Sequence, residues 1–481
     1  SKSTKSKPEE NEIEFPMDAS WEEIMTMSPE DAPFKKRETS GIMEGTPDTV
    51  PRAFRQYPRL KIDESANEKH NLHTLRGKRI LLVTDMPLTP AVRALPKAAD
   101  EAFEQLCDYF DARPDDDWYL TMYLMKDNIP FMQAGYLPEI LPPFKNGFSF
   151  NYDAWLYDQP SDYYRQHLLI HEMVHSFCNT VLGSVGPAWY AEGMAELLGM
   201  HDFQASPVEL RFMPPTREAV PHCGRIKEIH DAIERGEART FHQTFVNTNE
   251  DFRTNAVYYW SWAMANFLDR HPDTQAEFRA LPQLLKESVA ESQFTPQFLE
   301  NLGEKVPQLE KQWLMYVSTF DYGYNLAPML FDTTRGEPIR AGEKKLASVE
   351  ATRGWQNTLI HVKKGDRLRI RAKGRFELYQ PEGVYYPCEA NGITIRYHDG
   401  APLGILSATI LTDADSVSPE IMNDHQDGTF FAPFRIGLDR TIVVPFDGTL
   451  LLRINDSSAS LERNRGKLTV EISHTMRGLS R

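Results

Sequence analysis

The sequence predicts an α+β domain, with a small mixed sheet and several helices, followed by an all-β sandwich domain. Short apolar segments at residues 79–84 and 118–125 have the texture of buried strands, and long helical patterns follow them. From residue 355 onward the pattern changes to short alternating segments separated by Gly, Asn and Asp, which is typical of a sandwich. A chain of 481 residues is long enough for more than one such unit.

The composition is that of a globular protein, with 41% hydrophobic and 25% charged residues. The net charge of −16 disfavours nucleic acid and anionic membranes as partners, because both attract basic surfaces. No run of 18 apolar residues occurs, so we expect no membrane span. The four cysteines form no C-x-x-C pair, which argues against a cysteine-ligated zinc site, and we expect Cys107 and Cys178 to be buried thiols.

Changes in composition and in the pattern of apolar residues along the chain predict four segments. Residues 1–75 are polar and rich in Pro and charge, and we interpret them as a loosely packed arm. Residues 76–322 form the predicted α+β domain. A stretch rich in Gly and charge, residues 323–349, is interpreted as a linker to the sandwich at residues 350–481.

The small sheet comes first within the α+β domain. The strand at residues 79–84 is followed by a helical pattern at 95–110 and a second strand at 118–125. A further extended, aromatic stretch covers residues 148–157. This order of elements predicts a mixed sheet with helices packed against it.

Three long helices are then predicted. The first covers residues 161–183, with Ser161 as its N-cap and Gly183 as its C-terminal stop. The second covers residues 187–200 and begins at a proline, which is tolerated in the first turn. The third covers residues 255–270 and is stopped by the proline that follows.

Seven short alternating segments make up the predicted sandwich. They cover residues 358–362, 367–372, 393–397, 405–411, 441–445, 449–454 and 467–472.

The chemical centre of the sequence is the motif His171-Glu172-Met173-Val174-His175 on the first long helix. Two histidines four residues apart lie on one face of a helix, so both imidazoles can reach one metal ion. Glu172 projects about 100° away around the helix axis. It can therefore take a proton from a metal-bound water without binding the metal itself.

The next helix offers a third ligand, Glu192. A catalytic zinc site needs three protein ligands and an open fourth position for water. The small residues Ala191, Gly193 and Ala195 are expected to let this helix approach the motif helix closely. Glu196 lies one turn beyond Glu192, and two interpretations of it stay open: an acceptor for the N–H of a ligand histidine, or a solvated carboxylate.

This motif, with Trp189-Tyr190-Ala191-Glu192-Gly193-Met194-Ala195-Glu196 after it, resembles the gluzincin metallopeptidases, the superfamily of thermolysin and the zinc aminopeptidases. The resemblance covers about residues 79–320 and implies a zincin-like fold, a zinc cofactor and a peptide or protein substrate. It also implies that residues 148–157 are the edge strand that pairs with substrate. The residue roles that it implies are zinc ligation by His171, His175 and Glu192, and general-base catalysis by Glu172.

The same resemblance implies a donor to the oxyanion of the tetrahedral intermediate, carried by a helix downstream of the third ligand. The helix at residues 255–270 corresponds to it, and we favour Tyr258, with Tyr259 as the second choice. The alternative is that these aromatic residues are only core. Three histidines remain competitors for the role: His222, His230 and His242.

The C-terminal segment contains Gly365-Asp366-Arg367-Leu368-Arg369-Ile370, Pro402-Leu403-Gly404 and Ile454-Asn455-Asp456. These residues are similar to those of calcium-dependent galactophilic bacterial lectins, over about residues 350–475. The resemblance implies Asp456 and Asn464 as calcium ligands, glycan as a partner and an extracytoplasmic or secreted protein whose signal peptide has been removed. The alternative is a structural or protein-binding sandwich.

Two functional hypotheses follow. The first is a zinc metallopeptidase that hydrolyses peptide bonds with a zinc-activated water and Glu172 as the base. The second is a catalytically inactive gluzincin scaffold that acts as a carbohydrate- or protein-binding protein. The complete set of three ligands and a base favours the first. A purely structural zinc site is disfavoured, because such sites are usually rich in cysteine.

Overall fold

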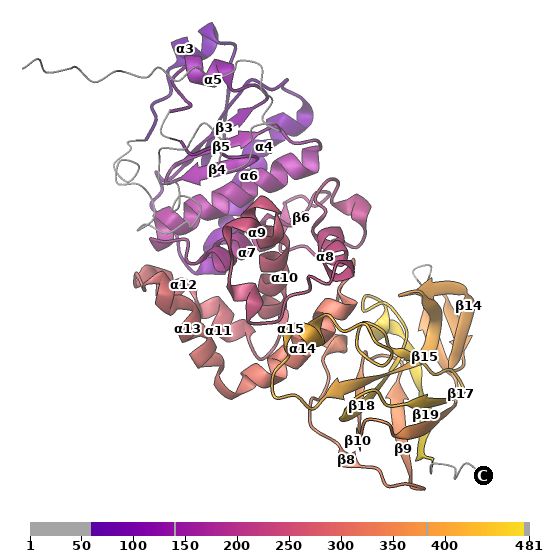
Figure 1. Ribbon diagram of the computed structural model, residues 1–481. Coiled ribbons are helices and arrows are strands. Elements are labelled where there is room, and N and C mark those ends of the chain that lie inside the picture. Colours follow the sequence, from indigo (N-terminus) through magenta and orange to yellow (C-terminus); the bar gives the residue numbers. More distant parts are fainter. Residues whose placement is uncertain (1–58, 139–140, 381–382, 476–481) are drawn as a thin grey trace, which may run out of the picture.

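The structure, a computed structural model, describes residues 59–138, 141–380 and 383–475 (Figure 1). It is a mixed α/β protein in which a first sheet, a group of helices and a β-rich C-terminal part follow one another in space as they do in the sequence. Most of the predicted polar arm, residues 1–58, lies outside the described residues. Within the described residues, no helix combines the length and the hydropathy that crossing a membrane requires.

The first sheet has five strands in the order β1-β2-β3-β5-β4. Strands β2, β3 and β5 are parallel, and the edge strands β1 and β4 are antiparallel to their neighbours. Helix α4 and helix α6 share a core with one face of this sheet. The strands are β1 (His73–Arg76), β2 (Ile80–Thr84), β3 (Leu120–Met125), β4 (Gly147–Phe150) and β5 (Asp153–Tyr157), and the helices are α4 (Pro90–Phe110) and α6 (Asp162–Phe177).

The predicted edge strand at residues 148–157 is in fact a hairpin. Asn151 adopts a left-handed conformation with φ 51°, which asparagine tolerates better than most residues, and the chain turns there. Gly147–Phe150 then pairs antiparallel with Asp153–Tyr157. The edge strand is therefore β4 alone, while β5 lies inside the sheet.

The sheet also begins earlier than the predicted boundary at residue 76. Strand β1 starts at His73 and pairs with β2 from His73 to Arg76, after a short helix, α3 (Glu64–Lys69). Strand β1 is only partly buried along its length. An edge strand of this kind carries no run of apolar residues, so its sequence resembles that of the polar arm.

The three predicted long helices are confirmed. Ser161 caps α6, its hydroxyl accepting a hydrogen bond from the Tyr164 amide, and a π-helical turn at Cys178–Leu182 continues it to Gly183, whose φ is 89°. The other two are α7 (Ala188–Gly199) and α10 (Ala256–Arg270). The remaining helices are α5 (Ile129–Gln133), α8 (Arg225–Glu234), α9 (Asn249–Arg253), α11 (Gln275–Ala280), α12 (Pro282–Lys286), α13 (Glu291–Leu302), α14 (Val306–Thr319) and α15 (Pro419–Met422).

The C-terminal part contains two six-stranded sheets, and one apolar core is built from residues of both. One sheet has the order β14-β15-β18-β10-β8, with β16 beside β15; the other has the order β13-β12-β19-β11-β17, with β9 beside β19. The first comprises β8 (Glu337–Pro338), β10 (Gln356–Val362), β14 (Asn391–His398), β15 (Ala401–Thr412), β16 (Phe434–Arg435) and β18 (Gly448–Ile454). The second comprises β9 (Lys344–Glu350), β11 (Arg367–Lys373), β12 (Phe376–Tyr379), β13 (Tyr385–Cys388), β17 (Asp439–Val443) and β19 (Arg465–His474).

All seven predicted strand segments overlap strands of these sheets. The segment predicted as a linker, 323–349, differs from the expectation, because β9 begins at Lys344 and pairs with β19 along its whole length. Strand β9 has the sequence KKLASVE, and Val349 is its only buried residue, which gave its sequence the appearance of a linker.

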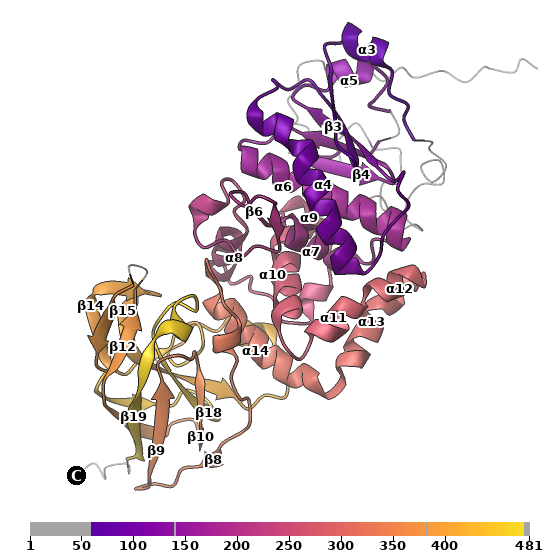
Figure 2. The same ribbon diagram turned by 180° about the vertical axis from the view of Figure 1, so that it is seen from behind.

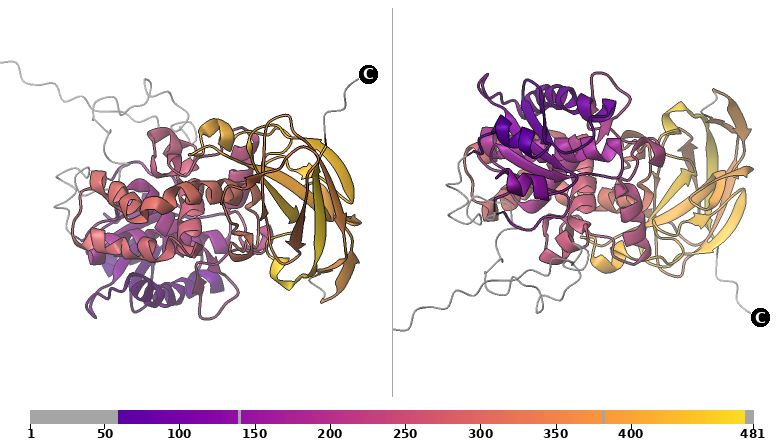
Figure 3. Two further views of the ribbon diagram at one scale, coloured as in Figure 1. Left: turned by 90° about the horizontal axis from the view of Figure 1, so that it is seen from below. Right: turned by 90° about the horizontal axis from the view of Figure 1, so that it is seen from above.

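The helices and the C-terminal strands are joined by a continuous core. Trp355, Phe430 and Leu451 come from the C-terminal part, yet they belong to the same buried cluster as the helices and the first sheet. Helix α14 lies at this junction, and views from behind, below and above all keep the C-terminal strands beside it (Figures 2 and 3). All four cysteines are buried and unbridged, as expected for Cys107 and Cys178.

Candidate metal centre

Three side chains from two helices converge on one point. Helix α6 supplies His171 and His175, and helix α7 supplies Glu192. The two Nε2 atoms are 3.1 Å apart, and Glu192 Oε2 lies 3.3 Å from His171 Nε2 and 3.5 Å from His175 Nε2. The three predicted ligands are therefore together, with their donor atoms facing one another.

The donor set fits a zinc ion. Ligand atoms about 2.0–2.1 Å from a tetrahedral zinc lie roughly 3.3 Å from one another, which matches the spacing of these three atoms. Glu192 Oε2 is buried and has no hydrogen-bond partner among the described residues. A buried carboxylate oxygen without a partner is costly, and a cation bound between the three atoms removes that cost.

The electrostatics also favour one positive charge at this point. Burial alone would raise the pKa of Glu192, but the imidazoles of His175 and His171 outweigh it and lower that pKa. Burial alone would lower the pKa of His171, but the carboxylates of Glu192 and Glu196 outweigh it and raise that pKa. The site therefore stabilises a cation, whether a proton on an imidazole or a bound metal ion.

Glu172 lies on a different side of α6 from the two histidines, toward the edge strand β4. Its carboxylate accepts a hydrogen bond from the Ser149 hydroxyl, and a Cβ atom built on Gly147 would lie 2.4 Å from Glu172 Oε1. Burial raises the pKa of Glu172, while the nearby His171 and His175 oppose that rise. A buried carboxylate with a raised pKa has the properties of a general base.

The structure separates the two predicted tyrosines. The Tyr258 ring centroid lies 6.2 Å from that of His171, and burial together with the charge of Glu192 raises the pKa of Tyr258, so its hydroxyl stays protonated as a hydrogen-bond donor. Tyr259 is buried elsewhere, against Trp260. The structure does not bring Tyr259 to the metal centre.

The competing histidines have other partners. His230 Nε2 lies 2.7 Å from the Phe320 carbonyl oxygen, and His242 Nε2 lies 2.8 Å from Glu310 Oε1. His222 is exposed in a turn ahead of α8. None of the three belongs to either of the two groups of possible metal ligands found among the described residues.

Glu196 is not a solvated carboxylate. It is 1% exposed and lies 3.4 Å from His171 Nδ1, on the side of that ring opposite Nε2. Its second oxygen lies 3.4 Å from His167 Nε2, and both oxygens accept hydrogen bonds from Arg225. Two of these residues, His167 and Arg225, were not predicted from the sequence. His167 continues the four-residue spacing of His171 and His175 and could have been found from it, whereas Arg225 carries no such signal.

One of the three small residues of α7, Gly193, acts differently from the expectation. A Cβ atom on Gly193 would lie 2.9 Å from the Ser261 carbonyl oxygen of α10, so Gly193 faces α10 and not the motif helix. The close approach to α6 occurs instead at Gly199, where a Cβ atom would lie 3.1 Å from His167 Cε1. Gly193 thus allows the helix bearing Glu192 to lie against the helix bearing Tyr258.

The residues that the lectin resemblance singles out do not fit a calcium site. Asn464 Nδ2 donates a hydrogen bond to Asp456 Oδ2 at 2.8 Å, and Asn464 Oδ1 accepts one from the Tyr379 amide. The other oxygen of Asp456 accepts from the Ser457 amide. The oxygens that calcium would need are therefore engaged within the fold, and an N–H group occupies the place beside Asp456.

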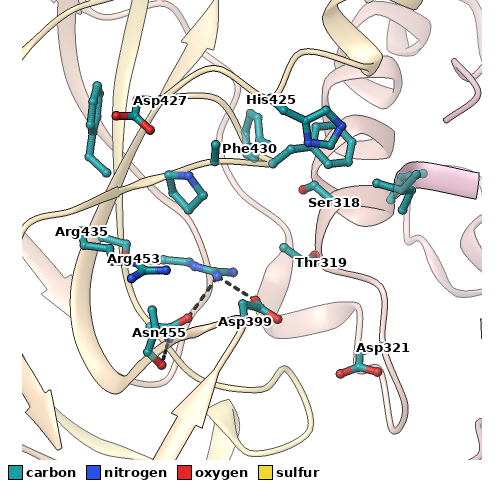
Figure 4. Close-up of a pocket in the computed structure, with 18 of the residues that line it drawn as sticks. Ser318, Thr319, Asp321, Asp399, His425, Asp427, Phe430, Arg435, Arg453 and Asn455 are labelled. Atoms are coloured by element: carbon teal, nitrogen blue, oxygen red, sulfur yellow. Dashed lines mark hydrogen bonds and ion pairs between the residues drawn. The ribbon is translucent and has the colours of Figure 1, made fainter. Parts of the chain in front are cut away.

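A second feature, a cavity of about 670 Å³, lies between α14 and the C-terminal strands (Figure 4). Arg453 reaches into it between Asp399 and Asn455, donating hydrogen bonds to Asp399 Oδ2 and Asn455 Oδ1 at 3.1 and 3.2 Å. Three arginines and four carboxylates line the cavity, with aromatic rings such as that of Phe430. The lining offers donors, acceptors and apolar surface without a large excess of either charge.

Comparisons with known proteins add little. No family model and no curated protein matches the chain. One solved structure that is similar in part is described as the N-terminal domain of EclA, a PllA-like lectin; it is 20% identical, and the match covers 27% of this chain and 94% of that one with a TM-score of 0.19. A likeness this distant carries no argument about fold or function.

Proposed function

We propose that the protein is a zinc-dependent peptidase, and that its helices and first sheet form a zincin-like catalytic domain beside a C-terminal sandwich domain. The observation that carries the proposal is the convergence of His171, His175 and Glu192 around an unpartnered buried oxygen, with Glu172 beside them. Three ligands of this type and a separate carboxylate are the composition of a catalytic zinc site, which keeps one position open for water.

Zinc bound there would supply a water of lowered pKa and would polarise the scissile carbonyl. Glu172 would act as the proton acceptor beside it, because its carboxylate is buried next to the ligand histidines, burial raises its pKa and the Ser149 hydroxyl holds it by a hydrogen bond. It then delivers the proton to the leaving amine. The Tyr258 hydroxyl donates a hydrogen bond to the oxyanion, which is the usual way of stabilising a tetrahedral intermediate. Strand β4 is the last strand of the first sheet among the described residues and lies beside Glu172, in the place where the resemblance to gluzincins implies pairing with an extended substrate.

The test is the substitution Glu172→Gln. We expect it to leave zinc bound at one ion per chain while hydrolysis of casein or a peptide library falls by about 10²–10⁴-fold, the range for removal of a general base. Glu300→Gln, at an exposed glutamate of α13, is the matched control and should leave both unchanged. Wild-type protein that binds no zinc, or a fully active Glu172→Gln variant, would refute the proposal.

The cavity of Figure 4 favours a second function, binding of a neutral, polyhydroxylated ligand such as a saccharide. Hydroxyl groups both donate and accept hydrogen bonds, and the paired Arg453, Asp399 and Asn455 offer both. This function is the main one if the metal centre proves inactive. Titration of the Glu172→Gln protein with free monosaccharides and oligosaccharides tests it, and Asp399→Asn should weaken any binding. Absence of binding to every saccharide class would refute it.

A further inference from the structure

His171 is held from two sides. Its Nε2 faces the other two ligand atoms, and its Nδ1 faces Glu196 Oε1 at 3.4 Å. For His171 to bind a metal through Nε2, its proton must reside on Nδ1, and the carboxylate that faces Nδ1 at 3.4 Å, ready to accept that proton, is Glu196. The orientation of this ligand therefore depends on where Glu196 is held.

Glu196 is held by Arg225, from helix α8. Arg225 Nε donates to Glu196 Oε2 at 2.8 Å, and Arg225 Nη2 donates to Glu196 Oε1 at 2.6 Å. Both side chains are buried, with 9% and 1% of their surface exposed. Two parallel bonds between a planar guanidinium and a carboxylate fix the plane of the carboxylate as well as its position.

The same buried group could be interpreted as a second metal site, since His167, Glu196 and Cys223 have donor atoms within 4.8 Å of one another. Two observations disfavour this. Both oxygens of Glu196 already accept from Arg225, and the guanidinium charge at this short distance opposes a divalent cation. Burial also raises the pKa of the Cys223 thiol to about 12, whereas a metal ligand must be the thiolate.

Arg225 also contacts the predicted oxyanion donor. Its guanidinium carbon lies 5.3 Å from the centroid of the Tyr258 ring, within the range of a cation–π interaction. One side chain thus touches both the carboxylate behind a metal ligand and the tyrosine in front of the metal centre. The metal ligand and the tyrosine come from different helices, α6 and α10, and Arg225 belongs to a third.

We infer that Arg225 is a positioning residue of the metal centre: through its two hydrogen bonds to Glu196 it orients His171 for metal binding, and through its contact with the Tyr258 ring it places the oxyanion donor. This inference rests on the proposed zinc site and assigns to Arg225 no contact with metal or substrate. If Arg225 has this role, a substitution that removes its two parallel hydrogen bonds to Glu196 should weaken zinc binding, even when the new side chain keeps the positive charge.

The experiment compares Arg225→Lys and Arg225→Gln with Arg211→Lys in the full chain. Lysine keeps the charge but cannot form two parallel bonds. Arg211 is a matched control, because its Nε and Nη2 also donate two hydrogen bonds to a buried carboxylate, here both to Oδ2 of Asp269, and Asp269 belongs to no group of possible metal ligands among the described residues. Zinc affinity is measured by competition with a chromophoric chelator, and the ligand field by the visible spectrum after substitution with cobalt.

We expect both Arg225 variants to bind zinc about 10-fold or more weakly, the range found for residues that orient metal ligands. Their cobalt spectra should shift, and at saturating zinc kcat should fall more than KM rises. Arg211→Lys should lower the melting temperature while leaving zinc affinity and the cobalt spectrum unchanged. If Arg225→Gln does not fold, Arg225→Lys and Glu196→Gln carry the test.

Different experimental outcomes would refute the positioning role of Arg225 and the proposed peptidase activity. A wild-type protein that binds zinc without hydrolysing peptides removes the peptidase proposal but leaves the affinity and spectral measurements intact. Arg225 variants with wild-type zinc affinity and cobalt spectrum overturn the inference alone. A wild-type protein with no zinc affinity overturns both.

Discussion

The close approach of Gly147 to Glu172 allows a direct test of whether strand β4 positions the proposed general base. A Cβ atom at residue 147 would lie 2.4 Å from Glu172 Oε1 and 3.0 Å from its Cγ and Cδ, whereas ordinary contacts begin near 3.4 Å. The substitution Gly147→Ala therefore displaces the carboxylate, or the strand, by about 1 Å. A displacement of that size in a reacting group costs on the order of 10²-fold in rate.

We expect kcat for peptide hydrolysis to fall by about that factor in Gly147→Ala, because the base no longer meets the water at the right distance. Zinc affinity should stay the same, since the three atoms nearest to a Cβ atom at residue 147 all belong to Glu172 and not to a ligand side chain. The matched control is Gly224→Ala, at a glycine with φ −88° where a Cβ atom would meet no atom within 4 Å. Full activity in Gly147→Ala would refute the positioning of Glu172 by β4, and loss of zinc would show that the strand acts on the ligands instead.

Two further predictions concern stability. Burial raises the pKa of Asp153 to about 6, so the folded state holds this proton more tightly than the unfolded state, and the free energy of unfolding should fall by up to about 3 kcal/mol as the pH rises from about 4 to 7. Chemical unfolding across this pH range should show the fall in wild type and not in Asp153→Asn; parallel curves would contradict it. Asn464→Ala should lower the free energy of unfolding by about 1–3 kcal/mol for each buried group that it leaves unpaired, and the groups that lose a hydrogen bond are Asp456 Oδ2, the Ala351 carbonyl oxygen and the Tyr379 amide. Millimolar calcium should not raise the melting temperature of the wild-type protein, and a calcium-dependent rise would show that the pair binds the ion.

Local patterns made much of the fold predictable. The helix at residues 161–183 has a side-chain cap at Ser161, and the helix at residues 255–270 has a largely apolar sequence. The buried strands at 79–84 and 118–125 are nearly continuous apolar runs. Two of the strands that escaped prediction, β1 and β9, lie at sheet edges, whereas β12, which was not predicted either, lies between β13 and β19. Strands β1 and β9 face solvent on much of their surface, so their residues are not constrained to be apolar and their pattern does not differ from that of a linker.

The candidate metal centre likewise combines residues that sequence spacing predicts with residues that only the folded structure brings together. His171, Glu172 and His175 are fixed by spacing on one helix, and Glu192 follows closely enough in sequence to be recognised. Arg225 lies 29 residues beyond Glu196 on another helix, and no spacing rule joins them. The choice between Tyr258 and Tyr259 likewise depends on how α10 is rotated about its axis, which is decided by its packing and not by its own sequence.

Helix α7 connects these parts into one site. Glu192 faces the histidines of α6, Gly193 lies against α10, and Glu196 meets Arg225 of α8, all within two turns. A side chain at residue 193 would meet the Ser261 carbonyl oxygen at 2.9 Å and push α7 from α10, which would separate Glu192 from Tyr258 even though neither residue had changed. The distances within the candidate metal centre therefore depend on backbone contacts of α7 outside it, and the motif at residues 171–175 by itself does not set the geometry that the proposed catalysis by zinc requires.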